Sequence, residues 1–408
     1  MNDDDAQRPV PGLAIISNGL TPYRVHFHQR IVREIPEFQL HSVLTHEDSS
    51  SPWDLSPPAE INVVRFGAGE KSGQASDPRR QLHEWRKGGR IIEWLKATRI
   101  AVVVVLGYSD AGRMRIIRWC HRSGVPVFLF GDSNIRGDLA RGAKAVAKRL
   151  LVSKIISWTD GVMPCGTLGE AFFRKYGARD GRIFYVPYEP DYDQIRSTTP
   201  DQVRQARERY HIEPNRRHLI YSGRLAEAKR VDLLIDAFAA IAGERPNWSV
   251  IIVGDGPLRA ALHDRVPAPL ADRFIWTGFL NDQSTINTLY HAADVLVLPS
   301  QYEPWALVVN EAAAAGLAIV ASDVVGAAAE LVRDGENGWT FRSGDLPELT
   351  ARLLDVTASE NAARYREASL VVLADWQERS DPVKGLRAAI SLSGPRRRIG
   401  RADHGLKG

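Results

Sequence analysis

The chain of 408 residues is 44% hydrophobic and 25% charged and carries a net charge of +4, as ordinary globular proteins do. Its length exceeds what one hydrophobic core supports and suits two domains of roughly 150–200 residues each. Its two cysteines, Cys120 and Cys165, exclude a disulfide framework and a structural zinc site. We expect both to be buried thiols in a reducing cytosol.

The first ten residues, MNDDDAQRPV, are acidic and lack an apolar segment, so we expect no signal peptide. Beyond them, short apolar runs alternate with helical patterns, which indicates an α/β architecture with mainly parallel sheets. The longest apolar run, 100–107, is far shorter than the ~20 residues of a membrane-spanning helix. The strands expected in the first half are 13–17, 40–45, 101–106, 126–130, 161–165 and 182–187.

Positive charge is concentrated in residues 79–157, where 17 Lys or Arg stand against 5 Asp or Glu. This asymmetry predicts an anionic partner, which could be a phosphorylated acceptor, a membrane surface or nucleic acid. Residues 140–158 have the pattern of a basic amphipathic helix, and Trp85 and Trp94 lie among further cations. We hypothesise peripheral docking at an inner membrane leaflet, with a solvated basic face as the alternative. No recognition motif for nucleic acid is present, so we expect no such partner.

A polar stretch, 189–217, contains no apolar run of its own, and we interpret it as the crossover between two domains. The second half then restarts the alternation of strands and helices. Ligands of open α/β sheets bind beyond the carboxyl ends of the strands, so the loops after these strands are the candidate binding segments. The strands expected here are 218–223, 248–254, 274–278, 295–300 and 318–323.

The first of these loops offers two cations. Arg224 and Lys229 directly follow the strand, and Gly223 allows close approach of the backbone. Arginine binds phosphate through two parallel hydrogen bonds, so the two cations together could neutralise a diphosphate. A solvated basic loop is the alternative. The later VGDGPL (253–258) lacks the G-x-G-x-x-G spacing and is weak as a phosphate loop.

The stretch SQYEPWALVVNEAAAAG (300–316) carries Glu303 and Glu311 eight residues apart. Proline is favoured at the first position of a helix, so we expect a helix from Pro304 that ends at Gly316. Glu303 then lies in the loop, and Glu311 lies about two turns inside the helix.

Between the two glutamates we expect the unpaired amides of Trp305, Ala306 and Leu307 at a helix end that binds phosphate. The order of carboxylate, amides and carboxylate matches the hexose, diphosphate and ribose of a nucleotide sugar. The alternative is a solvated Glu303 and a Glu311 at the exposed edge of an amphipathic helix.

With these pieces in order, the sequence resembles the retaining glycosyltransferases of family 4, which have the GT-B fold. The resemblance is carried by SGRLAEAKRVDLLIDAF, VGDGPLRAAL, FIWTGFL and the stretch from ADVLVLPS to DGENGWTF, within residues 218–342. The first half matches more loosely, through ISNGLTPYRVHFHQRI (16–31), GDSNIRGD (131–138) and KYGARDGRIFYVPYEPDYD (175–193).

The resemblance implies two Rossmann-like domains that face each other across a cleft. We expect an acceptor-binding domain at 11–195 and a nucleotide-sugar-binding domain at 216–370. A C-terminal helix at about 372–392 would pack back on the first domain, and a basic tail, 393–408, would be disordered.

The resemblance also implies roles for matching residues. Arg224 and Lys229 would hold the donor diphosphate and stabilise the leaving group, while Glu303 would contact the hexose. Glu311 would bind the ribose, and Gly19 would let the first loop approach the phosphate. Such enzymes need no metal or other cofactor, because cations and a helix dipole supply the electrostatic stabilisation.

Two departures from the family pattern matter. Trp305 and Ala306 stand where Phe-Gly is common, and Ala306 preserves the phosphate contact unless the turn needs a positive φ. Many members carry a histidine after the fourth strand of the first domain, where this chain has Asp132, Ser133 and Asn134. We place Asp132 and Asn134 on the acceptor side, with an Asx-turn or helix cap as the alternative. We expect His26 and His28 to be surface or packing residues.

We therefore expect a retaining transferase that moves a hexose from a nucleotide-diphosphate sugar to a glycan or lipid-linked acceptor, in surface polysaccharide or glycolipid assembly. The expected location is the cytoplasm, peripheral to the inner membrane face. A nucleotide-sugar epimerase of the same fold and a catalytically silent sugar-nucleotide-binding subunit are the alternatives.

Overall fold

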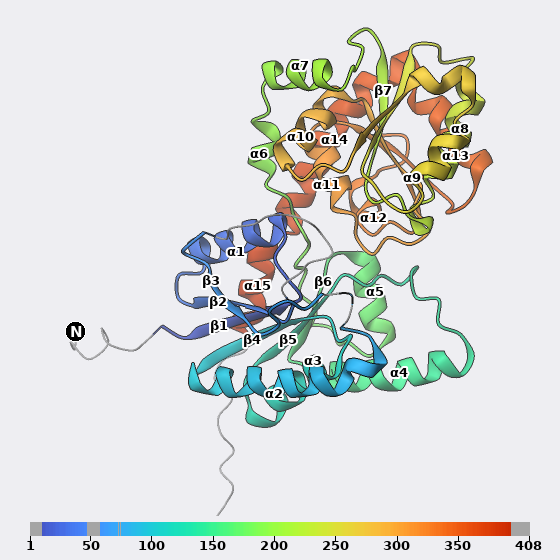
Figure 1. The fold of residues 1–408 in the computed structure, drawn as a ribbon. Coiled ribbons are helices and arrows are strands. Elements are labelled where there is room, and N and C mark those ends of the chain that lie inside the picture. Colours follow the sequence, from blue (N-terminus) through green and yellow to red (C-terminus); the bar gives the residue numbers. More distant parts are fainter. Residues whose placement is uncertain (1–9, 47–57, 72, 74, 393–408) are drawn as a thin grey trace, which may run out of the picture.

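The computed structural model describes residues 10–46, 58–71, 73 and 75–392. Within them the chain forms two parallel six-stranded sheets, each with helices on both faces (Figure 1). The expected α/β class with two Rossmann-like domains is therefore confirmed. The first sheet consists of β1 Gly12–Ser17, β2 Gln39–Leu44, β3 Asn62–Arg65, β4 Ile100–Leu106, β5 Val127–Gly131 and β6 Gly161–Pro164. The second consists of β7 Arg217–Ser222, β8 Trp248–Val253, β9 Phe274–Gly278, β10 Val295–Leu298, β11 Ala318–Ser322 and β12 Gly338–Phe341.

The strand order is β3-β2-β1-β4-β5-β6 in the first sheet and β12-β11-β10-β7-β8-β9 in the second. The central strands are apolar because both of their faces are covered, and β1 pairs Leu13 with Val102 of β4 in the buried core. The order reverses between β1 and β4 and again between β10 and β7, and a crevice opens beyond the carboxyl ends at such a reversal. The loops after β1 and β7 are therefore placed to bind a ligand.

Helices connect most successive strands. None of the helices in the described residues combines the length and apolar character that crossing a membrane requires. In the first domain they are α1 Pro22–Glu34, α2 Gln81–Ala97, α3 Ala111–Ser123, α4 Gly142–Ser157 and α5 Thr167–Lys175. The crossover holds α6 Tyr192–Arg196 and α7 Pro200–Arg209. The second domain has α8 Val231–Ile241, α9 Arg259–Arg265, α10 Gln283–Ala292, α11 Leu307–Ala314, α12 Ala328–Leu331 and α13 Leu346–Val356, followed by α14 Ser359–Arg379 and α15 Pro382–Ser391.

Three strand assignments differ from expectation. Residues 182–187 run beside β6 and share three backbone hydrogen bonds with it, but their pairing amounts to an isolated bridge between Ile183 and Val162 and not to a full strand. The sequence analysis did not predict β3 and β12, which have four residues each and form the outer edge of their sheets. Such short, half-buried edge strands lack the long apolar run that marks a central strand.

Two helices, rather than one, occupy the end of the described chain. α14 runs along α11 and α12 of the second domain, and α15 then packs on α1 of the first (Figure 1). The close approach of α15 needs Gly385, because a Cβ there would lie 1.8 Å from the Tyr185 carbonyl oxygen. Arg387 pairs with Glu37 beside α1. The last helix thus fastens the two domains together, and the basic tail expected at 393–408 lies outside the described residues.

Candidate functional site

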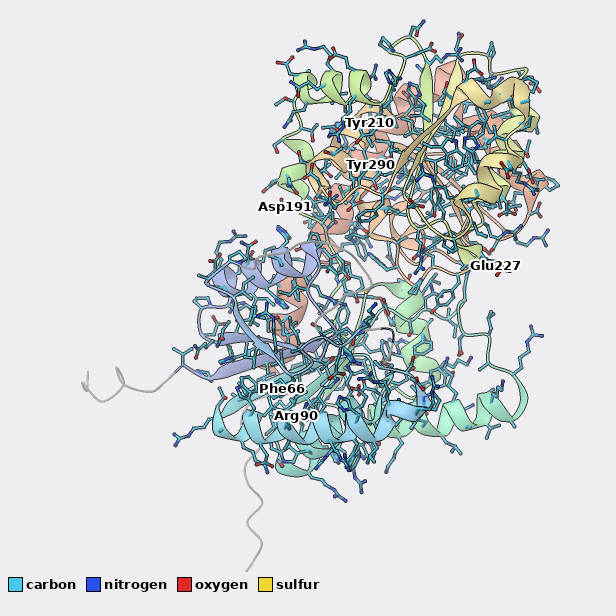
Figure 2. All side chains as sticks on the ribbon, viewed as in Figure 1. Phe66, Arg90, Asp191, Tyr210, Glu227 and Tyr290 are labelled. Carbon is cyan, nitrogen blue, oxygen red and sulfur yellow. The ribbon has the colours of Figure 1, made fainter. Side chains whose placement is uncertain are left out.

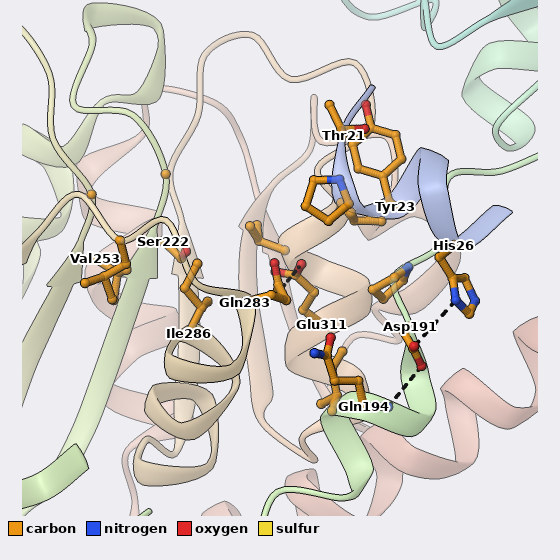
Figure 3. A pocket seen from close by; sticks show the side chains of 18 of the residues that line it. Thr21, Tyr23, His26, Asp191, Gln194, Ser222, Val253, Gln283, Ile286 and Glu311 are labelled. Atoms are coloured by element: carbon orange, nitrogen blue, oxygen red, sulfur yellow. Dashed lines mark hydrogen bonds and ion pairs between the residues drawn. The ribbon is translucent and has the colours of Figure 1, made fainter. Parts of the chain in front are cut away.

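A cavity of about 840 Å³ lies between the two domains, at the carboxyl ends of the strands (Figure 3). The start of α1 forms its wall on the first domain, with Tyr23 and His26, and the crossover adds Asp191 and Gln194. Asp191 lies at the junction of the two domains, as Figure 2 shows. The second domain contributes the loops after β7, β8 and β9 and the starts of α10 and α11.

Four of the predicted donor-binding residues line this cavity: Gly223, Arg224, Leu307 and Glu311. Gly223 has φ of 154°, and a Cβ at the neighbouring Gly254 would lie 2.0 Å from its carbonyl oxygen. Arg224 is exposed and takes part in none of the ion pairs found among the described residues. A free guanidinium at a strand end is thus available to an anionic ligand.

Glu311 is buried, and only 6% of its surface is exposed. Its Oε1 accepts a hydrogen bond of 3.1 Å from Gln283 Nε2, and its Oε2 accepts one of 2.8 Å from Tyr290 Oη. Burial raises the pKa of Glu311, and these two hydrogen bonds oppose the shift. Both donors lie on α10, seven residues apart, and therefore on one helix face. We did not predict these two donors; their i, i+7 spacing, which puts them on one helix face, was the available signal.

The helix that carries Glu311 does not begin at Pro304, as we expected, but at Leu307. The reason is a backbone pairing: Trp305 O accepts a 2.8 Å hydrogen bond from Ala327 N, and this keeps the preceding residues out of the helix. Glu311 is therefore the fifth residue of the helix rather than two turns inside it. The expected end is confirmed, with Gly316 at φ of 73° directly after the C-cap.

Ala306 is the N-cap of α11 and has φ of 75° and ψ of 81°. The turn thus has the positive φ that glycine adopts without strain, which is the exception stated above, so we no longer expect Ala306 to preserve the phosphate contact. The first amides of the helix, those of Leu307 and Val308, have no partner inside the helix, and both residues line the cavity. The partially positive end of α11 therefore faces the cavity.

Trp305, by contrast, turns its side chain away from the cavity. It is 3% exposed, and its ring lies 5.8 Å from the ring of Trp376 on α14. Among the predicted donor residues, Gly19 also lies outside the residues that line the cavity. Its carbonyl oxygen accepts a 2.6 Å hydrogen bond from Arg24, which fixes the first loop.

Lys229 and Glu303, also outside the lining, form an ion pair with each other. Lys229 ends a short 3₁₀ turn after β7, and Glu303 lies in the loop after β10. The Ser300 hydroxyl lies 3.5 Å from Glu303 Oε2, the oxygen that pairs with Lys229. The structure thus joins two of the three residues that were predicted to act on the donor, and places the third, Arg224, in the neighbouring cavity.

Asn134, predicted on the acceptor side, bridges the domains. Its Nδ2 donates to the carbonyl oxygens of Glu303, Pro304 and Val324, at 3.0, 3.2 and 3.1 Å. Its Oδ1 accepts a 2.8 Å hydrogen bond from the Gly137 amide. These bonds attach the first domain to the loop that carries Glu303.

Asp132 lies two residues earlier, at the end of β5, and is partly buried. Burial raises the pKa of Asp132, and the nearby Arg24 guanidinium opposes that shift. The two histidines of α1 differ. His28 is buried, and burial lowers its pKa to about 3, as for a packing residue. His26 lines the cavity, with Nδ1 3.6 Å from Asp191 Oδ2, so a surface or packing role does not describe it.

One group of metal-ligand type is present in the described residues: His46, Glu70 and Glu84, whose ligand atoms lie within 4.8 Å of one another. None of the three lines the cavity. The ammonium of Lys87 lies 2.7 Å from Glu70 and 3.0 Å from Glu84. A cation of the chain itself already occupies this group, and we assign no metal to it.

The sequence is similar to known proteins in the region that forms the second domain. Residues 202–369 match the family model of glycosyl transferases group 1. D-inositol 3-phosphate glycosyltransferase 2 of Catenulispora acidiphila is 32% identical over 240 residues, which cover 53% of this chain and 54% of that protein. The α-D-kanosaminyltransferase of Streptomyces kanamyceticus is 33% identical over 168 residues, 40% of this chain and 43% of that one. The chain thus spans about half or less of these curated relatives.

Solved structures match over nearly the whole chain. Anabaena HepE in complex with UDP and glucose has a TM-score of 0.70 at 18% identity and covers 94% of this chain and 99% of its own. Sucrose-phosphate synthase of Thermosynechococcus elongatus has a TM-score of 0.71 at 18% identity, over 94% and 100% of the two chains. Both matches include the two domains of this chain, since each covers 94% of its length. The chain therefore has the GT-B fold, and its residues 202–369 match the glycosyl transferases group 1 family.

Proposed function

We propose that the protein is a retaining glycosyltransferase of the family 4 type that transfers a hexose from a nucleotide-diphosphate sugar. The observation that carries the proposal is one cavity that combines a buried carboxylate, Glu311, with a free cation, Arg224, and the amino end of α11. A nucleotide diphosphate has hydroxyls for the carboxylate and a negative charge for the cation and the helix end. The UDP in the HepE structure supports such a donor.

In the proposed complex, Glu311 accepts hydrogen bonds from the ribose hydroxyls, and Arg224 and the amides of Leu307 and Val308 bind the diphosphate. Lys229 approaches the same phosphates from its ion pair with Glu303. Glu303 then faces the hexose, which lies toward the first domain. Gly19, in the fixed first loop, completes the donor contacts.

In the proposed reaction, the acceptor hydroxyl attacks the anomeric carbon from the face on which the diphosphate leaves. The bond between that carbon and the diphosphate oxygen breaks, and this oxygen takes the proton of the acceptor hydroxyl. Arg224 and Lys229 stabilise the charge on the leaving group, so the proposal requires no metal or other cofactor. It also requires no protein nucleophile, and Glu303 serves to hold the hexose.

The proposed acceptor is a glycan or a lipid-linked sugar of surface polysaccharide or glycolipid assembly, bound by the first domain near Asp132. The mannosyltransferase LpsB of lipopolysaccharide core biosynthesis from Rhizobium meliloti supports this class, at 33% identity over 162 residues. The proposal places the protein in the cytoplasm, peripheral to the inner membrane face.

Calorimetric titration with UDP, GDP and their sugar conjugates, with and without EDTA, tests the donor site. We expect tight binding of one diphosphate that EDTA does not change and that Glu311→Ala and Arg224→Ala abolish. Glu367→Ala, an exposed glutamate on α14, is the control and should bind as the unmodified protein does. If the folded protein binds none of these compounds, the transferase proposal is wrong.

Incubation with the bound donor then separates the alternatives. An epimerase would convert the donor to an epimer or free sugar without any acceptor, and a silent subunit would bind the donor without consuming it. A retaining transferase should release sugar slowly to water with its anomeric configuration preserved, which NMR measures directly, and should do so faster with acceptor present.

A further inference from the structure

The first half of α4 has an apolar surface that nothing in the described chain covers. The second half is anchored in the core by Val152, Ile155 and Ile156. The first half projects beyond the body of the domain, past α5 (Figure 1). Its leucines and valine are exposed to 61% at Val146, 70% at Leu150 and 49% at Leu151, and Leu139 in the preceding loop is exposed to 74%. A solvated basic helix would not need apolar residues at these positions.

Two of these residues, Val146 and Leu150, lie on one stripe of the helix, and Leu151 lies to one side of it. Successive residues turn by about 100°, so Val146 and Leu150 share a face. A shallow depression of about 400 Å³ follows this stripe, and its lining repeats at three and four residues: Val146, Arg149, Leu150, Ser153, Lys154 and Ser157. Val146 and Leu150 thus share one surface with the cations Arg149 and Lys154.

The charge of the segment has one sign. Residues 139–157 contain five cations and no acidic residue: Arg141, Lys144, Lys148, Arg149 and Lys154. Lys148 lies on the inner side of the helix, where it pairs with Asp138 at 2.7 Å. The other four remain outside the ion pairs of the described residues. The projecting surface is therefore both apolar and strongly positive.

We infer that this surface of α4 docks on an anionic lipid bilayer. Leu139, Val146 and Leu150 would enter the boundary between headgroups and acyl chains, while Lys144 and Lys154 would bind lipid phosphates. A second copy of the chain fits less well, because it would bring an equally basic surface against this one. Docking here would hold the first domain, the proposed acceptor side, against the membrane, and that consequence alone rests on the proposed function.

Cosedimentation of the full chain with vesicles tests the docking without donor or acceptor. We expect binding to vesicles of phosphatidylcholine and phosphatidylglycerol at 3:1, weaker binding at 0.5 M NaCl, and little binding to pure phosphatidylcholine. Val146→Asp with Leu150→Asp should reduce binding at least tenfold, and so should Lys144→Glu with Lys154→Glu. The matched control is Leu370→Asp with Val371→Asp, an exposed pair on α14 of the second domain, which should bind normally.

Nucleotide binding in the same samples verifies that each variant is folded, because the donor cavity lies on other elements. Absence of vesicle binding by the unmodified protein, or equal binding by the α4 and α14 variants, would overturn the docking. So would light scattering that shows a dimer which only the α4 variants dissociate. Vesicle binding without nucleotide binding would leave the docking standing and overturn the proposed function alone.

Discussion

Replacing Tyr290 by phenylalanine should change the pH at which the protein binds its nucleotide. The Tyr290 side chain is fully buried, and its hydroxyl donates a 2.8 Å hydrogen bond to Glu311 Oε2. Phenylalanine keeps the ring and removes only that donor. Burial already raises the pKa of Glu311, and the lost hydrogen bond was one of two interactions that lowered it. The pKa of Glu311 therefore rises further in the variant.

The size of the shift follows from the hydrogen bond. A hydrogen bond to a charged group contributes roughly 1.5–3 kcal/mol, and one pKa unit corresponds to about 1.4 kcal/mol. The pKa of Glu311 should rise by about one to two units. Ribose hydroxyls donate to the ionised carboxylate, so affinity should fall on the acid side of this pKa and recover on the alkaline side. The midpoint of the affinity–pH curve should move up by about one to two pH units.

Calorimetric titration of the bound diphosphate between pH 5 and pH 9 measures this midpoint. Tyr365→Phe is the matched control, because Tyr365 is also buried and its hydroxyl lies 2.8 Å from a carboxylate, that of Asp355, away from the cavity. The control should leave the midpoint in place, and Glu311→Gln should remove it. A midpoint that stays in place or moves down in Tyr290→Phe would refute the assignment of Glu311 to the ribose.

Three further changes test the site. Asn134→Asp puts a carboxylate in place of the amide that faces three carbonyl oxygens. We expect donor affinity to fall at least tenfold, which corresponds to about 1.4 kcal/mol. An unchanged donor affinity with a raised acceptor KM would favour the acceptor-side role. Ala306→Gly removes a backbone strain of about 1–2 kcal/mol at positive φ, and the greater flexibility of glycine in the unfolded chain offsets part of that gain. The Tm of this variant should therefore hold or rise, whereas Ala306→Val should lower the Tm. Glu311→Gln should raise the Tm of the ligand-free protein more at alkaline pH than at acid pH. Since the pKa of Glu311 is raised in the folded state, the stability this residue contributes is lost as pH rises through that pKa, and glutamine does not ionise.

The sequence predicted the architecture because its strongest signals are local. Long apolar runs such as those of β4 and β8 mark central parallel strands wherever they occur. The edge strands β3 and β12 were missed because four half-buried residues leave no such signal. The start of α11 was misplaced for a different reason. Pro304 obeys a local rule, but hydrogen bonds from the loop around Gly326 hold the backbone outside the helix.

For the site, too, residues marked by a local pattern were predicted and residues placed by long-range packing were not. The loops after the strands indicated Arg224 and Glu311, because a strand end followed by polar residues is a local pattern. Tyr290 and Gln283 escaped notice because their function depends on the packing of α10 against α11, and their i, i+7 spacing shows only that they share a face of α10. His26 was dismissed for the same reason: α1 reaches the cavity only because the two domains face each other.

Asn134 shows what the sequence pattern leaves open. A polar residue beyond the carboxyl end of a strand in a two-domain protein can bind a ligand or the opposite domain, and both roles need the same residue type at the same place. The three carbonyl oxygens around its amide belong to the loops after β10 and β11. One of them is the carbonyl of Glu303, whose side chain holds Lys229. A first-domain residue thus positions the ion pair that the donor is proposed to meet, so changes in how the domains face each other should reach the donor site through the Asn134 side chain.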